Sequence, residues 1–140
     1  MKASILVAAL GITLTGISGT ATAGCSTDRV NDLNALLSGN TVCVPVATTA
    51  NMQWQELHQA GGDLIDYKRG PSSTIDKSEK VGTWSISSDV NGGYFVVHNY
   101  GAGGLFTWAV YDNKNGTHSF CGPSGAPEVV ARVKPGGGAC

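Results

Sequence analysis

The segment from Val81 to Cys121 constrains the fold of this chain most strongly. It contains four runs rich in Val, Ile, Tyr, Phe and Trp, and three short turns separate them, with the sequences SDVNGG, GAGG and DNKNG. β-Branched and aromatic residues fit a pleated, half-buried surface, and Asn-Gly supplies the positive φ angles that tight hairpins need. The segment therefore predicts an up-and-down antiparallel meander. This pattern does not by itself indicate any particular activity.

The start of the chain has the features of a secretory signal peptide. Lys2 is followed by an apolar stretch from Ile5 to Leu14, and Ala21-Thr22-Ala23 forms a small-x-small cleavage site. We expect cleavage after Ala23, which leaves residues 24–140 as one exported domain, either periplasmic or secreted. Lipidation of Cys25 is an alternative to simple cleavage, although the residue three positions before it is Thr rather than Leu.

The cysteine content agrees with export. All four cysteines follow the predicted cleavage site, and an even number in an exported chain predicts two disulfide bonds. Three pairings are possible, and sequence proximity favours Cys25–Cys43 with Cys121–Cys140. No CxxC motif is present, so neither a zinc ribbon nor a thioredoxin-like site is expected.

The remaining segments extend the β pattern and add one helix. An amphipathic helix is expected between Ser26 and Ser38, ended by Gly39, with the task of closing one end of a barrel or covering a sheet edge. Eight sequential strands with short turns predict a mainly β fold, a small closed barrel, because closure removes exposed edges. The expected strands are 41–46, 52–58, 63–68, 81–87, 93–100, 105–111, 117–121 and 128–134.

Period-two alternation assigns the faces of the central strands. One face of the run 94–100 carries Tyr94, His98 and Tyr100, and we expect this more polar face to point outward. We expect the opposite face of this run, together with the apolar faces of the neighbouring strands, to form the interior. A packed core is the first expectation for this interior, and a ligand cavity is the alternative. The expected interior residues are Trp84, Ile86, Phe95, Val97, Phe106, Trp108, Val110 and Phe120.

The residues singled out for ligand binding lie around the expected hairpin 52–68 and the polar segment 69–80. They combine aromatic, acidic and basic groups, as recognition surfaces do, although a solvated loop would look similar. The candidates are Trp54, Glu56, His58, Tyr67, Lys68 and Arg69. Glu56 and His58 share one strand face and form a minimal acid–base pair, but no third partner is evident, so we expect a protein that is not an enzyme.

Several other functions find little support in the sequence. The full chain has a formal net charge of −1 and no basic stripe, so nucleic acid is not an expected partner. Neither a GxGxxG nor a GxSxG motif is present, and no cofactor is expected. His58, His98 and His118 lie on different hairpins without ligand spacing, which favours three surface histidines over a metal site. The apolar stretch at the start is too short and interrupted to predict a membrane span.

A resemblance to known proteins covers roughly residues 34–87. The order LNALLSGNTVCV, WQELHQAGGDLIDYK and VGTWSIS, with FCG at 120–122 as a weaker extension, resembles a group of small exported bacterial proteins of largely unknown function. The resemblance implies a small β-barrel similar to lipocalin- and avidin-like folds. Lipocalins carry a G-x-W motif on their first strand, whereas Gly82-Thr83-Trp84 lies in the middle of this chain, so no lipocalin ligand site is carried over.

Taken together, these features predict an exported bacterial binding protein whose partner is a small molecule, a cell-surface component or another protein. An inhibitor of a lysozyme or protease is an alternative, with 69–80 as the inhibitory loop, because a rigid loop loses little entropy on binding. A structural subunit of a surface assembly is a further alternative, because strand edges left by incomplete closure could pair with another copy.

Overall fold

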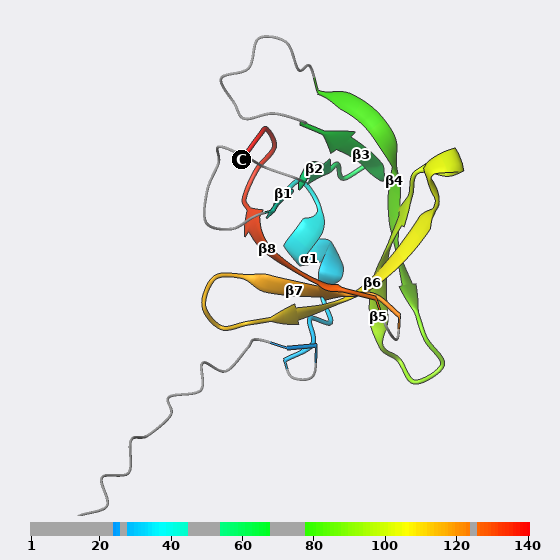
Figure 1. The fold of residues 1–140 in the computed structure, drawn as a ribbon, viewed down its shortest axis with the longest axis vertical. Helices are drawn as coiled ribbons and strands as arrows, with labels where there is room; N and C mark the ends of the chain where they lie inside the picture. The colour runs from blue at the N-terminus through cyan, green and yellow to red at the C-terminus, as the bar shows by residue number, and fades with distance from the viewer. Residues whose placement is uncertain (1–23, 26–27, 45–53, 68–77, 124–125) are drawn as a thin grey trace, which may run out of the picture.

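The computed structural model describes residues 24–25, 28–44, 54–67, 78–123 and 126–140, and these form a closed antiparallel β-barrel. Each strand pairs with the next in the sequence, and the first pairs with the last (Figure 1). The strands are β1 (Thr41–Val44), β2 (Trp54–His58), β3 (Asp63–Asp66), β4 (Glu79–Ser88), β5 (Tyr94–Asn99), β6 (Leu105–Asp112), β7 (His118–Cys121) and β8 (Glu128–Lys134). A 3-10 turn, η1 (Gly101–Gly103), connects β5 to β6.

The predicted fold class is therefore confirmed, as are eight strands in up-and-down order. The observed turns explain why local sequence predicted them well. In the β4–β5 hairpin, the Asp89 carboxylate accepts hydrogen bonds from the backbone N–H groups of Asn91 and Gly93, and Gly92 adopts a positive φ of 81°. These turn conformations depend on residues within a few positions of one another, so the local sequence is enough to predict them.

The N-terminal helix is shorter than predicted. Helix α1 spans only Leu33–Leu37, and Asp32 caps it by accepting a hydrogen bond from the N–H of Ala35 at 2.9 Å. Arg29 instead forms an isolated antiparallel bridge with Tyr111 of β6, and the backbone N–H of Val30 donates to the carbonyl of Val110 in β6 at 2.8 Å. Pairing with an open stretch of β6 thus replaces the first predicted helical turns. Residues 26–27, and with them the predicted Ser26 or Thr27 cap, lie outside the described residues.

The disulfide pairing predicted from sequence proximity is wrong. The bonds are Cys25–Cys121 and Cys43–Cys140, which span 96 and 97 residues of the chain. Closure of the barrel places β1 beside β8, so the segment after β8 runs back across β1 and β2. The hydroxyl of Thr41 donates to the carbonyl of Gly138 at 2.8 Å, which holds this returning segment in place. The two bonds fit an oxidising environment of the kind that exported proteins meet. The predicted signal peptide, residues 1–23, lies outside the described residues.

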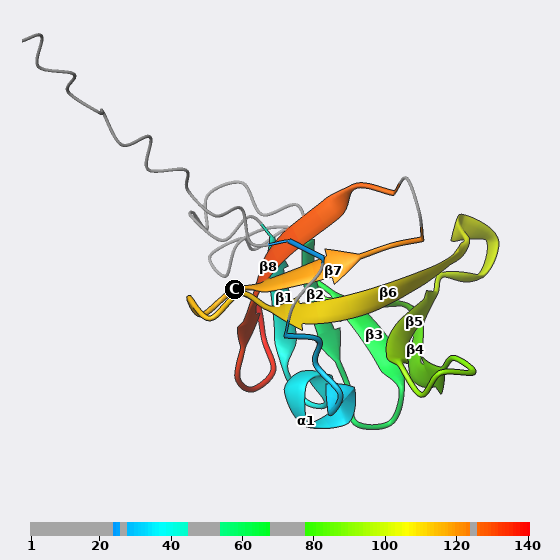
Figure 2. The same ribbon diagram turned by 90° about the horizontal axis from the view of Figure 1, so that it is seen from below.

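The two ends of the barrel differ because successive antiparallel strands reverse direction. Helix α1 and the β2–β3, β4–β5 and β6–β7 turns lie at one end, and α1 sits within the ring of strands (Figures 1 and 2). Leu33 and Leu37 of α1 are fully buried in the core, so the helix closes this end. The β5–β6 and β7–β8 connections lie at the opposite end, which we call the open end. None of the helices in the described ranges is long and apolar enough to cross a membrane.

The core contains about half of the predicted interior residues. Trp84, Trp108, Val110 and Phe120 are buried as expected, whereas Ile86 is 37% exposed and Phe106 is 43% exposed. Strand β5 is turned the other way from the prediction. Its residues Val96 and His98 are buried, and Phe95 and Val97 are only half-buried. Because apolar residues occupy both faces of β5, alternation alone could not choose between them.

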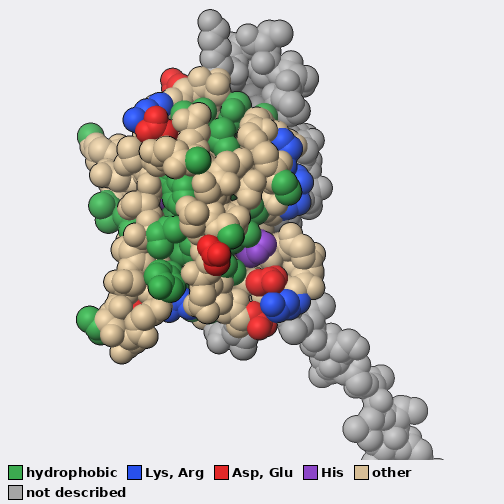
Figure 3. Space-filling model, turned by 180° about the vertical axis from the view of Figure 1, so that it is seen from behind, with side chains coloured by type: hydrophobic (Ala, Val, Ile, Leu, Met, Phe, Trp, Pro, Cys, Tyr) green, Lys and Arg blue, Asp and Glu red, His purple; other side chains and the backbone are tan. Residues whose placement is uncertain are grey.

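The outer surface carries a number of exposed hydrophobic side chains. One face of the molecule shows hydrophobic side chains scattered across its middle, with charged side chains mostly towards its edges (Figure 3). Six large hydrophobic residues in the described part of the chain are exposed: Ile86, Val90, Tyr94, Leu105, Phe106 and Val130. Phe106 differs from the others because its exposure comes from its position at the open end of the barrel interior, where the candidate site lies.

Candidate functional site

Strand β2 carries two ionisable side chains into the barrel. Glu56 and His58 alternate with Gln55 and Leu57, and Glu56 pairs in register with Val42, whose side chain is part of the core. Glu56 and His58 therefore point inward, and their exposed fractions are 8% and 0%. Gln55 and Leu57 point outward but are also buried, because the chain after β8 covers them. The N–H of Cys140, for example, donates to the Gln55 side-chain oxygen at 2.9 Å.

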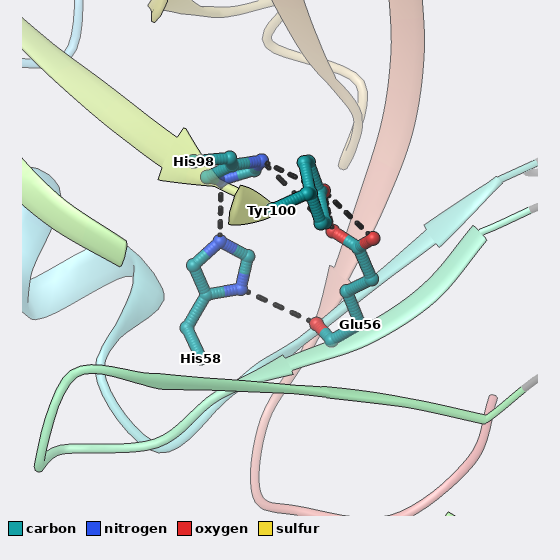
Figure 4. Close-up of polar contacts among 4 residues, drawn as sticks. All are labelled: Glu56, His58, His98 and Tyr100. Carbon is teal, nitrogen blue, oxygen red and sulfur yellow. Dashed lines mark hydrogen bonds and ion pairs between the residues drawn. The ribbon is translucent and has the colours of Figure 1, made fainter. Parts of the chain in front are cut away.

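Strand β5 and the residue that follows it supply the partners. His98 pairs in register with Trp84 on β4 and with Phe106 on β6, which places its ring inside the barrel. Tyr100 follows two positions later and points the same way. Figure 4 shows how these two side chains meet Glu56 and His58 across the interior. We call these four residues the polar network.

The two histidines of the polar network form a direct hydrogen bond. Their Nε2 atoms lie 2.9 Å apart, and Nδ1 of His58 lies 3.3 Å from the backbone carbonyl oxygen of Glu56. A carbonyl oxygen can only accept, so His58 donates from Nδ1 and accepts at Nε2, and His98 donates from its own Nε2. This arrangement makes both rings neutral. Burial favours the same state, because it lowers the pKa of His58 to about 4 and, together with the neighbouring His58, that of His98 to about 3.

Glu56 and Tyr100 form the other half of the polar network. The Tyr100 hydroxyl lies 2.8 Å from each carboxyl oxygen of Glu56 and 3.4 Å from Nδ1 of His98. Burial raises the pKa of Glu56 to about 7; the Tyr100 hydrogen bond opposes this rise, and the nearby charge of Asp66 adds to it. Burial and the adjacent Glu56 also raise the pKa of the Tyr100 hydroxyl well above its ordinary value. Glu56 is thus a carboxyl group that exchanges a proton near neutral pH, beside a phenol that stays protonated.

A cavity of about 480 Å³ opens onto Glu56 and Tyr100 at the open end of the barrel. The described residues that line it are Glu56, Tyr100, Gly103, Phe106, Trp108, Pro127 and Val129. Most of this described lining is apolar, and Glu56 is the one acidic group in it. The rings of Tyr100 and Phe106 meet edge to face, with centroids 5.8 Å apart. The cavity can therefore surround an apolar molecule and offer a carboxyl group and a hydroxyl group for hydrogen bonding.

The six sequence-predicted binding residues have different outcomes. Glu56 and His58 meet inside the barrel, so the predicted face sharing is observed, and His98 and Tyr100 supply the further partners that the sequence did not reveal. Trp54 begins β2. Tyr67 is half-buried just after β3, and its N–H donates to the carbonyl of Gln55 at 2.9 Å. Lys68 and Arg69, and most of the loop 69–80, lie outside the described residues.

Sequence reasoning placed His98 and Tyr100 on the outer surface, and this prediction is wrong. His98 is 3% exposed and Tyr100 is half-buried. The prediction of three surface histidines fails for the same reason, since His58 is also buried. One signal could have corrected it: Val96 shares a strand face with His98, and a face that carries Val between its polar residues can be the inner one.

The polar network is not arranged as a metal site. Two nitrogens bound to one tetrahedral zinc ion lie about 3.4 Å apart, from zinc–nitrogen bonds of about 2.1 Å, whereas the Nε2 atoms of His58 and His98 are 2.9 Å apart and share a proton. The described residues contain no group of three or more His, Cys, Asp or Glu side chains that could hold a metal ion.

Comparison with known proteins adds no functional assignment. No protein family matches the chain, and neither the curated proteins nor the solved structures include a significant match. The closed eight-stranded antiparallel barrel is consistent with the lipocalin-like fold that the sequence resemblance implied.

Proposed function

We propose that this protein binds a small, mainly apolar molecule in the cavity at the open end of the barrel, and that Glu56 and Tyr100 hydrogen bond the polar group of that molecule. The observation that carries the proposal is the cavity itself. Its volume of about 480 Å³ lies within the range of about 300–1,000 Å³ that is typical of small-molecule sites. Its lining also has the usual composition of such sites, with apolar walls and a few converging polar groups.

The position of the cavity supports this proposal over a surface site. A second cavity of about 490 Å³ lies on the outside of the barrel, beside the Cys25–Cys121 disulfide. Its charged residue, Arg29, already stacks on Phe95 and donates to the carbonyl of Tyr94 at 2.8 Å. The open-end cavity instead meets a carboxyl group whose charge is not balanced by a described cation. The charge of Arg29 thus already faces a carboxylate, that of Asp89 at 4.0 Å, whereas the described residues offer Glu56 no such counter-charge.

The proposal concerns a binding protein rather than an enzyme, and one that works outside the cytoplasm. Two disulfides fit that location. The eight-stranded barrel provides a rigid wall, since every strand is paired on both sides. A wall of this kind needs little ordering when a ligand enters, which favours affinity.

A cavity-filling substitution tests the proposal. Val129 lines the cavity, whereas the next residue of β8, Val130, is 38% exposed on the outer face. Val129→Trp should fill the cavity and weaken binding of the neutral apolar dye N-phenyl-1-naphthylamine at least tenfold, measured by its fluorescence. Val130→Trp should leave dye binding unchanged. Thermal unfolding of both variants establishes that they are folded. Absence of dye binding to the wild type, or equal binding by both variants, would refute the proposal.

A further inference from the structure

We propose that the molecule bound in this cavity is an amine that enters as a cation, with its ammonium group on Glu56 and Tyr100 and its apolar skeleton against the aromatic wall. The inference rests on the proposed function, because it names the chemical class of ligand for the same cavity. It follows from the charges around Glu56, the hydrogen-bonding groups available and the rings in the lining.

The described groups that face Glu56 are neutral or acidic. Within the described ranges, the titratable groups that face its carboxyl group are Tyr100 and His98 from the β5 side, His58 on its own strand, and Asp66, its register partner on β3. Both histidines are neutral in their hydrogen-bonded arrangement, Tyr100 is a phenol, and Asp66 is an acid. Among the described residues that line the cavity, none is Lys or Arg. A carboxylate removed from water needs a cation or a proton, and in the empty cavity the proton serves this purpose.

The hydrogen-bonding groups suit an ammonium ion. Its N–H groups can donate to the Glu56 oxygens and to the Tyr100 oxygen, which retains lone pairs while its own proton is donated to Glu56. The resulting hydrogen bonds are charge-assisted and therefore stronger than those of a neutral alcohol. A ligand carboxylate or phosphate would instead meet a like charge.

The aromatic wall adds a second attraction for a cation. Tyr100, Phe106 and Trp108 all line the cavity that Glu56 faces. The faces of aromatic rings attract ammonium groups, and this attraction strengthens where water is excluded. Carboxylate and rings together favour a protonated amine over a neutral molecule of the same shape.

A matched series of probes tests the ligand class. The compounds 2-phenylethylamine, 2-phenylethanol and 3-phenylpropionate share one ring and a similar length but carry positive, neutral and negative ends. In displacement of N-phenyl-1-naphthylamine at pH 8, the amine should act at a concentration at least tenfold below that of the alcohol, and the carboxylate should be weakest. The advantage of the amine should shrink towards pH 5.5, where Glu56 becomes protonated.

Glu56→Gln should abolish the preference for the amine while the dye and the alcohol still bind. Glu128→Gln removes the charge of a carboxyl group on β8 outside the cavity lining but keeps an oxygen that can accept the hydrogen bond of the Ser119 hydroxyl, and it should preserve the preference. Calorimetry in buffers of different ionisation enthalpy gives an independent readout. Amine binding at pH 7 should release about half a proton per site, because a group with a pKa of about 7 is then half protonated.

The outcomes separate this inference from the proposed function. If the dye binds and Val129→Trp blocks it, but the alcohol or the carboxylate competes as well as the amine, the amine inference is wrong and the binding function stands. An amine preference that survives Glu56→Gln would also contradict the inference. If the dye does not bind at all, both proposals fail.

Discussion

Replacing Glu56 with Gln should make the protein more stable at high pH, by an amount set by the buried carboxyl group. Gln has nearly the same shape but no proton to lose. The pKa of Glu56 is raised from its ordinary value of 4.5 to about 7, which corresponds to about 3 kcal/mol at about 1.4 kcal/mol per pKa unit. Between those two pH values the folded state binds more protons than the unfolded state. The contribution of Glu56 to stability is therefore complete below pH 4.5 and is lost as the pH rises to 7.

The histidines of the polar network act in the opposite direction in the wild type. Their pKa values are lowered from 6.5 to about 4 for His58 and about 3 for His98, so the unfolded state binds more protons below pH 6.5. Stability from the neutral histidines is present above pH 6.5 and is lost as the pH falls towards 4. The two trends partly cancel in the wild type, which makes its own pH profile a poor test. The difference between the variant and the wild type isolates Glu56.

Urea unfolding followed by tryptophan fluorescence gives the free energies of unfolding of both proteins. Between pH 5 and pH 8 the stability of Glu56→Gln relative to the wild type should rise by about 2.5 kcal/mol, because most of the proton linkage of Glu56 falls in this interval. Glu128→Gln controls for the loss of one negative charge, since Gln keeps an oxygen that can accept the hydrogen bond of the Ser119 hydroxyl, and it should show no comparable rise. A stability difference that is independent of pH would mean that Glu56 ionises as freely in the folded state as in the unfolded one, and the reasoning would be refuted.

Two further predictions concern the barrel itself. Gly82→Ala should destabilise the protein by about 1–3 kcal/mol, because a Cβ atom there would collide with the backbone of Asn99 on the neighbouring strand. Gly61→Ala is the control, since a Cβ atom at Gly61 meets nothing within 4 Å. Comparison of the urea unfolding midpoints of the two variants checks this prediction. Replacing Cys43 and Cys140 together by Ser should lower the free energy of unfolding by about 4–5 kcal/mol, since their bond closes a loop of 97 residues. Non-reducing peptide mapping of the wild type should show the Cys43–Cys140 bond. A peptide that links Cys25 to Cys43 would contradict the fold.

The sequence predicted the strands well because their signals are local. The run 105–111 corresponds to β6, Leu105–Asp112, and the run 117–121 to β7, His118–Cys121. Alternating apolar residues and Asn- or Gly-containing turns act over a few positions, and the barrel does not override them. The candidate pair Glu56 and His58 was predictable in the same way, since period two fixes which residues of one strand share a face.

Features that depend on barrel closure could not be predicted from the sequence. The partner of Cys43 is Cys140 because β8 pairs with β1, and the separation of the cysteines along the chain carries no information about that contact. The start of α1 depends on closure too. The pairing of β6 with β5 ends at Trp108, so the carbonyl of Val110 is open to the backbone of Val30, a residue that the sequence placed in the helix.

The burial of His98 explains why the site was only half predicted. A histidine on a half-apolar strand is normally an outward residue, because leaving an unpaired polar group in a core is costly. Here the Nε2 atom of His58, on a strand 40 residues earlier, accepts the hydrogen bond of His98 and removes that cost. The partner is visible only in three dimensions. A prediction from hydrophobic alternation considers each residue without its partners. It therefore places on the outer face a polar residue whose burial depends on a hydrogen bond to a distant strand.

The same carboxyl group links stability to the proposed function. Without a ligand, keeping Glu56 ionised in the barrel costs about 3 kcal/mol, at about 1.4 kcal/mol per pKa unit. A residue without a role in binding could be replaced by Gln at this position, with the Tyr100 contact retained and that cost removed. Sites that bind charged ligands commonly carry such a cost in the empty state. An ammonium ligand would offset it, so Glu56→Gln should yield a protein that is more stable at pH 8 and poorer at binding amines. If one substitution produces both effects, the energetic cost and the ligand preference arise from the same buried charge. A variant that gains stability without losing amine binding would separate them.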